Sequence, residues 1–577
     1  MPVIWHRRHA VLGVFALAAL LRLPALERCP PPIQQDEASR AYDAWCLLET
    51  GEDRHGASWP LFLESFGPGD FTAALSTYIS IPFVALFGPG ALSVRLPDAL
   101  FGVLTVILLH GWLKRQYDER FALAAALFLA LDPWHVSICR TGHESGYAPF
   151  FLVAALSAAY RAGLLPGGTG DAARGSSTHS SSGFGILAGL AAGFLAWLYP
   201  ATRLLTPLLF LAWLMTCAPR RAGVSTAKRS SIIAAVIGVV VGAAPLWITA
   251  LAHPERLAAR AGVTIFATSD QPLSARVSAV FKNYAANLSP QYQFQSFDDI
   301  SGSYYDGVGL HLLVFAPFVV AGLIRTIIQA RQAAWSRFLL AWFVLYLLPA
   351  AICLDWNPHS FRTVGGIPLF AVLAGTGWRW AGDSLIRWRP AALAPARNVM
   401  LVLIGANGIY FAHQYFRVLP GKLELGYQTA LVRAMEFAGP KSAEADFVLV
   451  TQRTIQPYIY ALLYAPIPPT TLEKMPAIRG GGIQAFDEVV RIGKYFFPPS
   501  GSGDPKLTEL FVRAWNELPA DSEGLVVEEA GRFGAGRVLA VFERESPDRQ
   551  APPLEVRWWR KSEDPTPCVI ESAPGKP

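Results

Sequence analysis

Two adjacent carboxylates, Asp36 and Glu37, follow the first apolar segment of the chain, which ends near Leu26. A carboxylate can act as a general base that takes the proton from an attacking hydroxyl, provided that an arginine or hydrogen bonds orient it. The plain alternative is a solvated loop acid at the end of an apolar helix. The pair is therefore a candidate base, and its surroundings must decide between the two interpretations.

Basic side chains stand at four further points, each next to the start of an apolar segment. Any one of them can be an anchor whose charge reaches water from a buried stem, or half of a structural ion pair, such as Arg140 with Glu144 one helical turn away. Ionisable groups at membrane depth are costly, however, and usually functional. Together the four points indicate a basic cavity for an anion such as a lipid-linked phosphate, because guanidinium groups bind phosphate oxygens in pairs. The residues are Arg95, Arg140 with His143 and Glu144, Tyr199 with Arg203, and His359 with Arg362.

The elements that must position these groups are membrane helices. Of the 577 residues, 52% are hydrophobic and 16% are charged, against roughly 25% charged residues in soluble domains. Mean hydropathy is +0.32. Apolar runs of about 20 residues recur over the first 415 positions, and each is long enough to cross ~30 Å of hydrocarbon. The fold class is therefore mainly α, and the formal charge of +6 reflects loop arginines rather than nucleic-acid binding.

The basic loops predict a topology. Lysine and arginine near helix ends stay in the cytoplasm, and about eleven spans place every basic cluster, such as Lys114-Arg115, on that side. Asp36 and the four basic points are then left outside. The apolar stretch Phe71 to Phe87 would invert every later basic loop if it crossed the membrane. We therefore expect it to lie at the interface or to be re-entrant.

This topology divides the chain into two domains. Residues 1–415 form the transmembrane domain, with a long first outer loop at 27–92 and a second at 253–308. An odd number of spans puts residues 416–577 outside as a soluble extracytoplasmic α/β domain, long enough for a core of its own. The protein is predicted to be integral to the cytoplasmic (inner) membrane, with its site and its tail facing outward, toward the periplasm.

The tail differs in pattern from the rest of the chain. Charged residues become frequent after about residue 416, and short alternating runs appear at Asp446–Val450 and at Arg537–Phe542. Such runs predict strands, and the segment from Thr508 to Asn516 predicts a helix.

Several familiar sites have no counterpart in the sequence. There is no P-loop, no GxGxxG after a strand, no HExxH and no pair of CxxC motifs. The isolated histidines His253, His311 and His413 are predicted to lie at the interface rather than to bind a metal. No cofactor and no metal are therefore expected, and an enzyme working outside must act without cytosolic nucleotides.

The order of these motifs resembles that of the GT-C membrane glycosyltransferases, in the bacterial branch similar to protein O-mannosyltransferases and to the aminoarabinose transferase of lipid A. The resemblance covers the chain to about residue 415, and the tail is not part of it. The segments that carry it are Asp36-Glu37-Ala38, Val94-Arg95-Leu96-Pro97-Asp98, Asp132-Pro133 with Arg140 and Glu144, Tyr199-Pro200-Ala201-Thr202-Arg203, and Asn357-Pro358-His359-Ser360-Phe361-Arg362.

The resemblance implies an inverting transfer of a sugar from a polyprenyl-phosphate donor to an extracytoplasmic acceptor. It implies Asp36 as the catalytic base, Glu37 as its assistant, and Arg95 and Arg140 at the donor phosphate. The phosphate leaves already ionised, so the chemistry does not require a metal. The acceptor stays open between a protein hydroxyl, a lipid and a glycan.

Two other classes of protein compete with this interpretation. A flippase or transporter for a lipid-linked saccharide predicts ionisable residues at mid-depth of several helices and an internal repeat, and the sequence contains few such charges. A non-catalytic scaffold that uses the tail for interactions would leave the outer arginines unexplained.

Overall fold

The structure is a computed structural model of the 577-residue chain, and it divides into two compact units. The helical unit comprises Met1–Leu26 and Arg95–Leu419, and the mixed unit comprises Glu27–Val94 and Pro420–Pro577. The first outer loop thus clusters with the C-terminal residues rather than with the helices that flank it. The structure describes residues 2–31, 33–67, 70–167, 181–217, 226–258, 271–297, 307–353, 357–422, 429–450, 456–465, 467–472, 477–481, 487–499, 505–519, 521–529, 537–542 and 554–561.

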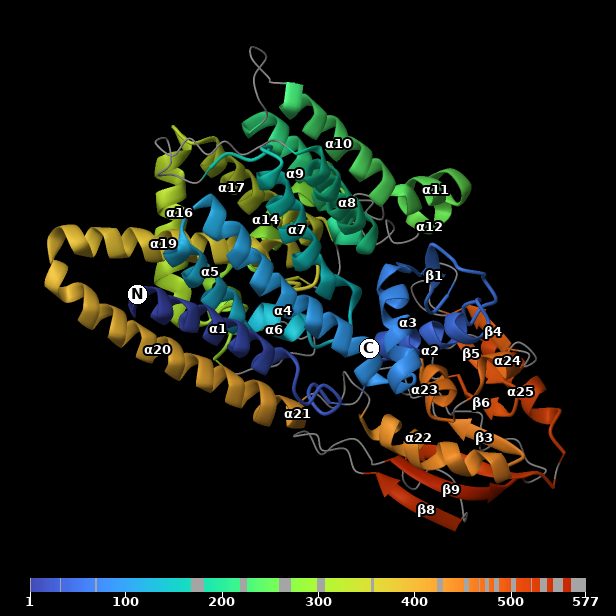
Figure 1. Ribbon diagram of the computed structural model, residues 1–577. Coiled ribbons are helices and arrows are strands. Elements are labelled where there is room, and N and C mark those ends of the chain that lie inside the picture. Colours follow the sequence, from blue (N-terminus) through green and yellow to red (C-terminus); the bar gives the residue numbers. More distant parts are fainter. Residues whose placement is uncertain are drawn as a thin grey trace. The chain divides into compact units, whose positions relative to one another are not determined.

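The helical unit is built from helices, shown in blue to yellow in Figure 1. Each apolar run of the sequence forms a helix, because in hydrocarbon the backbone must satisfy its hydrogen bonds within the segment. The α-helices are α1 (Pro2–Arg22), α4 (Ala91–Gln116), α5 (Glu119–Leu131), α6 (Pro133–Ile138), α7 (Ala148–Arg161), α8 (Ser182–Leu198), α9 (Pro200–Thr216), α10 (Thr226–Gly242), α11 (Ala244–Ala252), α12 (Pro254–Ala258), α14 (Leu273–Leu288), α15 (Pro290–Phe294), α16 (Ala316–Ala330), α17 (Ala334–Leu345), α18 (Leu348–Ala351), α19 (Ile367–Trp388) and α20 (Leu393–His413). Short 3₁₀ turns are η1 (Glu144–Tyr147), η3 (Leu313–Phe315), η4 (Val364–Gly366) and η5 (Pro390–Ala392), and the π-helical turn η6 (Gln414–Val418) follows α20.

Several of the predicted spans are interrupted. Among the described residues, four helical stretches are long and apolar enough to cross a membrane, or five if α10 and α11, bent by 51°, count as one span. The span expected near 120–137 breaks at Asp132, the residue before Pro133, which cannot continue a regular helix. The structure thus holds several apolar helices, and the number eleven stays a prediction.

Glycines allow two pairs of helices in this unit to approach backbone to backbone. A Cβ atom added at Gly189 of α8 would meet the carbonyl of Ala235 on α10, and one added at Gly238 would meet the carbonyl of Ile186. Gly322 of α16 and Gly377 of α19 make the same kind of contact with carbonyls on each other's helix. Small residues at such positions are how membrane helices gain packing without a hydrophobic driving force.

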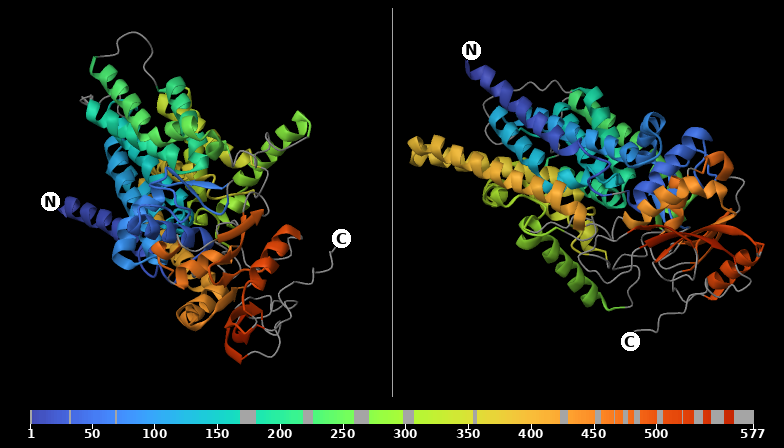
Figure 2. Two further views of the ribbon diagram at one scale, coloured as in Figure 1. Left: turned by 90° about the vertical axis from the view of Figure 1, so that its right-hand side faces the viewer. Right: turned by 90° about the horizontal axis from the view of Figure 1, so that it is seen from below.

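The mixed unit combines a seven-stranded sheet with helices on both of its faces. The strand order is β4-β5-β6-β3-β7-β9-β8, with β3 parallel to β6 and β7 and the remaining neighbours antiparallel; the orange and red strands lie side by side in Figure 2. The strands are β3 (Phe447–Val450), β4 (Ala477–Gly481), β5 (Asp487–Ile492), β6 (Tyr495–Phe496), β7 (Glu523–Glu529), β8 (Arg537–Phe542) and β9 (Leu554–Arg560). The helices after residue 419 are α21 (Leu419–Lys422), α22 (Thr429–Lys441), α23 (Pro457–Tyr464), α24 (Pro469–Leu472) and α25 (Pro505–Asn516), and the 3₁₀ turn η7 (Ser442–Glu444) precedes β3.

Alternation along β3 supplies a core to each face of the sheet. Val448 and Val450 belong to a cluster with residues of α22 and α23, whereas Phe447 and Leu449 pack with Trp515 of α25. This is the period of two expected of a strand covered on both sides. The predicted strands near 446–450 and 537–542 and the predicted helix near 508–516 correspond to β3, β8 and α25.

The first outer loop supplies part of this core. It forms α2 (Gln35–Glu49), the two-stranded antiparallel hairpin β1 (Phe62–Glu64) and β2 (Phe71–Ala73), and α3 (Leu75–Phe87). Tyr42 of α2 is buried in the cluster with α22 and α23, and its hydroxyl donates to the carbonyl of Ile467 at 2.8 Å. The stretch expected at the membrane interface is therefore a short strand followed by a helix, and its placement against a membrane stays a prediction.

Candidate active site

The two predicted catalytic carboxylates lie in the first turn of α2 and have different surroundings. Asp36 is exposed, whereas Glu37 is fully buried. The Oε2 atom of Glu37 accepts a hydrogen bond from the backbone N–H of Gln34 at 2.9 Å, which satisfies a donor that the helix leaves open at its start. Glu37 thus fixes the beginning of the helix that carries Asp36. Arg40 stands four residues after Asp36, at the spacing at which an acid and a base are neighbours on a helix.

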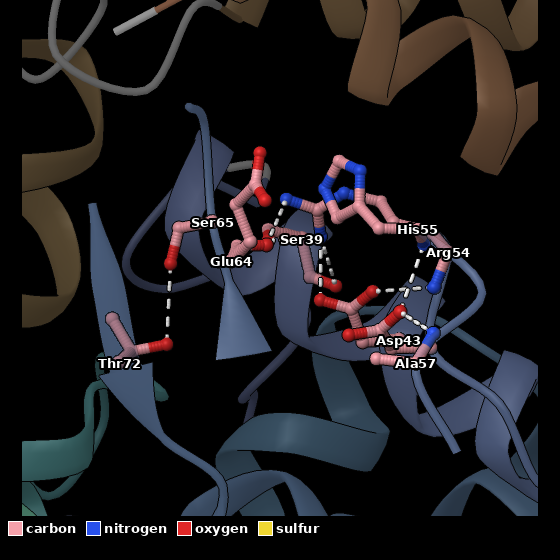
Figure 3. Close-up of polar contacts among 9 residues, drawn as sticks. Ser39, Asp43, Arg54, His55, Ala57, Glu64, Ser65 and Thr72 are labelled. Carbon is pink, nitrogen blue, oxygen red and sulfur yellow. Dashed lines mark hydrogen bonds and ion pairs between the residues drawn. The ribbon is translucent and has the colours of Figure 1, made fainter. Parts of the chain in front are cut away.

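One helical turn beyond Arg40, a buried ion pair ties α2 to the loop that follows it. The Oδ2 atom of Asp43 lies 2.5 Å from Nη1 of Arg54, and both side chains are almost completely buried. The same Nη1 donates to the hydroxyl of Ser39 at 2.6 Å, and the backbone N–H of Arg54 donates to Oδ1 of Asp43 at 3.3 Å. Figure 3 shows the guanidinium directed at both side chains.

Burial sets the acidity of this pair. It raises the pKa of Asp43 to about 7, because the carboxylate loses its water, although the positive charge of Arg54 opposes the shift. A carboxyl with such a pKa gains and loses its proton near neutrality. Sequence reasoning missed Asp43, although it lies seven residues after Asp36, two turns along the same helix.

The loop around Arg54 is held by further polar contacts. The Oδ1 atom of Asp53 accepts from the backbone N–H groups of His55 and Ala57, both at 2.9 Å. The hydroxyls of Ser65 and Thr72 lie 3.1 Å apart across the hairpin (Figure 3). These contacts give the segment that follows the candidate base a defined shape.

In the helical unit, the predicted phosphate ligands Arg95 and Arg140 are both fully buried and donate to main-chain carbonyls. Nη1 of Arg95 donates to the carbonyl of Leu26 at 2.7 Å. Arg140 donates to the carbonyl of Arg22 at 2.7 Å and to that of Pro24 at 2.8 Å. The carbonyls at the carboxyl end of a helix carry partial negative charge, so Arg140 holds the end of α1, whereas Arg95 holds the turn that follows it.

The sequence predicted that one helical turn separates Arg140 and Glu144, but the two residues do not share a helix. Helix α6 ends at Ile138, Arg140 follows in a turn, and Glu144 begins η1. The guanidinium of Arg140 also lies over the rings of Tyr415 and Phe416, at 5.4 Å and 4.9 Å from their centres. The prediction of a single helical turn between Arg140 and Glu144 is therefore wrong.

A second group of predicted residues does come together, from three segments far apart in the sequence. The ring of His143 stacks on Phe361 at 4.3 Å and meets the ring of Tyr199 edge-on at 5.5 Å. The ring of His359 also lies beside Phe361, with the ring centres 6.0 Å apart. We call His143, Tyr199, His359 and Phe361 the aromatic cluster. It joins the residue before η1, the N-cap of α9 and the loop before η4.

Hydrogen bonds orient the cluster. Nδ1 of His143 accepts from the backbone N–H of Ser145 at 3.1 Å, so the ring proton of the neutral form sits on Nε2, which lies 3.6 Å from Oε2 of Glu144. Burial lowers the pKa of His359 well below its usual value, and the positive charges of Arg362 and His143 add to this effect. His359 is therefore a neutral polar side chain at physiological pH.

The two remaining predicted arginines are half-buried. Arg203 lies in the first turn of α9, four residues after Tyr199, and Arg362 lies three residues after His359. Both keep part of their surface open, in contrast to Arg95 and Arg140. They are the two arginines of the predicted set whose side chains are not fully buried.

Sequence reasoning also missed a buried contact beneath the cluster. His311, predicted to be interfacial, is fully buried, and its Nδ1 lies 2.6 Å from Oδ1 of Asp132. The other oxygen of Asp132 accepts from the backbone N–H of His135 and caps α6. In the sequence, Asp132 before Pro133 is a pattern that predicts the start of a helix. Nothing in the sequence predicts that Asp132 contacts His311.

In the described part of the chain, no group of three or more histidine, cysteine or acidic residues could hold a metal ion. The expectation of a reaction without cofactor stays a prediction. Of the outer loop 253–308, residues 259–270 and 298–306 lie outside the described residues.

The sequence matches known proteins over part of its length. The profile of the family described as Dolichyl-phosphate-mannose-protein mannosyltransferase matches residues 73–248. Over 125 residues the chain is 30% identical to "Putative mannosyltransferase YycA" of Bacillus subtilis (strain 168), which is 21% of this chain and 18% of that protein. This match thus spans less than a fifth of its relative.

The structure matches solved glycosyltransferases over most of its length. ArnT from Cupriavidus metallidurans, bound to undecaprenyl phosphate, superposes with a TM-score of 0.55 at 12% identity, over 100% of this chain and 99% of that one. The Archaeoglobus fulgidus oligosaccharyltransferase, tethered with an acceptor peptide containing the NVT sequon, gives 0.52 at 13% identity, over 91% and 69%. The resemblance to the GT-C membrane glycosyltransferases is confirmed at the level of the fold, and the helices long enough to cross a membrane support an integral membrane protein.

Proposed function

We propose that this protein transfers a sugar from a polyprenyl-phosphate donor to an acceptor hydroxyl outside the cytoplasm, with inversion at the anomeric carbon. The fold shared with ArnT over the whole chain supports the donor class. The match to the mannosyltransferase family profile supports the transfer of a sugar. The observation that carries the proposal is the division of labour in the first turn of α2, where one acid is exposed and the next is buried in the helix cap.

In this mechanism Asp36 takes the proton of the acceptor hydroxyl. The oxygen forms its bond to the anomeric carbon while the bond from that carbon to the phosphate oxygen breaks, and both electrons leave with the lipid phosphate. An exposed carboxylate on a helix fixed by Glu37 suits a general base, because the base must be both accessible and held in place.

For the donor phosphate we favour Arg203 and Arg362, with His359 as a neutral hydrogen-bond donor. Arg95 and Arg140 are fully buried and donate to carbonyls at the end of α1 and in the turn that follows it, so moving them to a phosphate would leave those carbonyls unsatisfied. We assign them to positioning. A guanidinium at the phosphate stabilises the charge that develops on the leaving group.

We place the protein in the inner membrane with Asp36 and the aromatic cluster facing the periplasm. The basic ends of the helices support this orientation, since they are retained in the cytoplasm. Residues 416–577 would then lie outside as well. The acceptor is a hydroxyl of a protein, a lipid or a glycan.

The test compares three variants in membrane vesicles supplied with undecaprenyl-phosphate mannose and, separately, with undecaprenyl-phosphate aminoarabinose. Asp36→Asn should lower transfer at least a hundredfold, the usual contribution of a general base. Glu37→Gln should keep most of the activity, and Glu49→Gln, an exposed acid at the other end of α2, should keep all of it.

Each outcome has a defined meaning, provided that the variants insert to equal levels. Full activity of Asp36→Asn would remove Asp36 from the mechanism. Movement of labelled donor lipid across the bilayer without transfer, at equal rates in all variants, would favour the flippase interpretation.

A further inference from the structure

The helical unit holds a second polar cavity, which the proposed reaction does not use. Its volume is about 170 Å³, more than a single water fills. Three of its lining side chains are guanidinium groups, those of Arg325, Arg379 and Arg387, and only one is a carboxylate, that of Asp383. Its floor is made by buried Thr326 and Ser336, among others.

The cavity lies far from the aromatic cluster along α19. That helix begins at Ile367, directly after η4, and its lining residues run from Thr376 to Arg387. At 1.5 Å per residue these positions are roughly 14 to 30 Å from the start of the helix. The remaining walls are the turn after α4, the start of α5, the end of α16 and the start of α17.

The lining of the cavity carries more guanidinium groups than carboxylates. Arg379 lies 3.0 Å from Oδ2 of Asp118 and 3.9 Å from Oδ2 of Asp383. Arg387, at the exposed rim, donates to an uncharged oxygen, the hydroxyl of Ser384, at 3.2 Å.

The surface beside the cavity is apolar. Ile324 and Ile328 of α16 flank Arg325 in sequence and are 45% and 52% exposed. At the end of α19, Ile386 is 45% exposed and Trp388 is 86% exposed. Tryptophan at the end of a membrane helix is typical of the level of the lipid headgroups. The acyl chains of a molecule whose anionic group is bound by the arginines can thus lie along these exposed side chains.

We propose that this cavity binds the phosphate group of an anionic membrane lipid. Basic pockets between helices on the cytoplasmic side take such headgroups, and the ends of α4, α16 and α19 that form this one are those predicted to face the cytoplasm. Arg325, Arg379 and Arg387 supply positive charge, Thr326 and Ser336 offer hydroxyls, and the isoleucines of α16 accompany the acyl chains.

The experiment measures the lipid retained by the full-length protein. Wild type, Arg325→Gln/Arg387→Gln and the control Arg331→Gln/Arg389→Gln are placed in nanodiscs of phosphatidylcholine with a minor share of phosphatidylglycerol. Bound phosphatidylglycerol is then counted by native mass spectrometry. The control removes two exposed arginines of the same basic end that do not line the cavity. We expect roughly thirtyfold weaker retention in the first variant, as the loss of two basic contacts predicts, and no change in the control.

Two further arms keep the proposal open to refutation. Thr376→Met fills the cavity without altering charge, and it should also lower retention. Inorganic phosphate added to protein in phosphatidylcholine alone should not raise the melting temperature. Equal retention in all variants would overturn the proposal. So would a rise in melting temperature with inorganic phosphate that Arg325→Gln/Arg387→Gln abolishes, because the site would then take free phosphate. None of these readouts depends on sugar transfer.

Discussion

The two units of this protein bury arginine in different ways. In the mixed unit, Arg54 is neutralised by a carboxylate, that of Asp43, eleven residues earlier in the chain. In the helical unit, Arg140 and Arg95 are bonded to main-chain carbonyls at the end of α1 and in the turn that follows it, more than sixty residues away in sequence. Arg22 of α1 does likewise, donating to the carbonyls of Leu129 and Ala130.

The difference separates two ways of placing a charge in a low-dielectric interior. A carboxylate compensates the charge fully, but it must itself be desolvated. The cost of desolvating both ions often exceeds the free energy gained from their attraction. Carbonyls at a helix end lack a hydrogen-bond donor within the helix. A buried arginine that donates to them therefore supplies a partner that they need in any case. The first arrangement responds to pH and the second does not.

The largest effect should come from breaking the ion pair. Arg54→Met leaves Asp43 buried without its partner and should destabilise the mixed unit by about 3–5 kcal/mol. The double substitution Asp43→Leu/Arg54→Met should recover most of that loss, since an apolar pair of similar volume replaces the charges. Thermal unfolding of the full chain measures both. A double variant as unstable as the single one would show that the pair itself, and not the stranded carboxylate, stabilises the fold.

The corresponding substitution in the helical unit should cost less and should have no apolar rescue. Arg140→Met leaves at least two carbonyls at the end of α1 without donors, a loss on the order of 3 kcal/mol at ~1–3 kcal/mol for each. Arg140→Lys should restore part of it, because an ammonium also donates. Melting temperatures in nanodiscs report the change. An unaffected Arg140→Met protein would contradict the role in holding α1.

The pH dependence should distinguish the two regions. Since the pKa of Asp43 in the folded chain is raised to about 7, above the ~3.9 of an unfolded aspartate, the folded state holds this proton more tightly. Its contribution to stability is therefore complete below about pH 4 and is lost as the pH rises through 7, with a slope of at most about 1.4 kcal/mol per pH unit. Asp43→Asn should flatten this part of the stability profile, and Arg140→Met should not. An identical slope in both variants would exclude Asp43 as its source.

The smallest effect concerns the start of α2. Glu37→Gln keeps an acceptor for the N–H of Gln34 and should cost no more than about 1 kcal/mol, the size of a helix-cap contribution. Sugar transfer should be lost when Asp36 is substituted and largely retained when Glu37 is substituted. A Glu37→Gln protein of normal stability without transfer activity would give Glu37 a chemical role beyond capping.

The sequence predicted the helices and the short strands well, because each of them reflects a local period. The run at Arg537–Phe542 alternates and forms β8, and the segments that became α8 and α9 are apolar between polar turns. The break at Asp132 was readable from Pro133 but was taken as the interior of a span. What a local pattern cannot give is the partner of a residue.

The candidate site shows the same limit. Tyr199, His143 and His359 were expected to share a cavity and do cluster, because each stands next to the start of a helix on one predicted side. Arg140 is buried and has an unexpected partner, since nothing near it in sequence indicates the carbonyls of Arg22 and Pro24. The link between His311 and Asp132 spans 179 positions and is likewise a product of tertiary packing.

The glycine contacts between α8 and α10 constrain the order in which this chain assembles. The two helices touch backbone to backbone, yet α9 lies between them in the sequence. During synthesis α8 must therefore wait beside the translocon until α9 has entered and α10 has emerged, its glycine ridge covered meanwhile by lipid or by another protein. A side chain at Gly189 or Gly238 would collide with the backbone of the facing helix and would therefore block this last step of assembly.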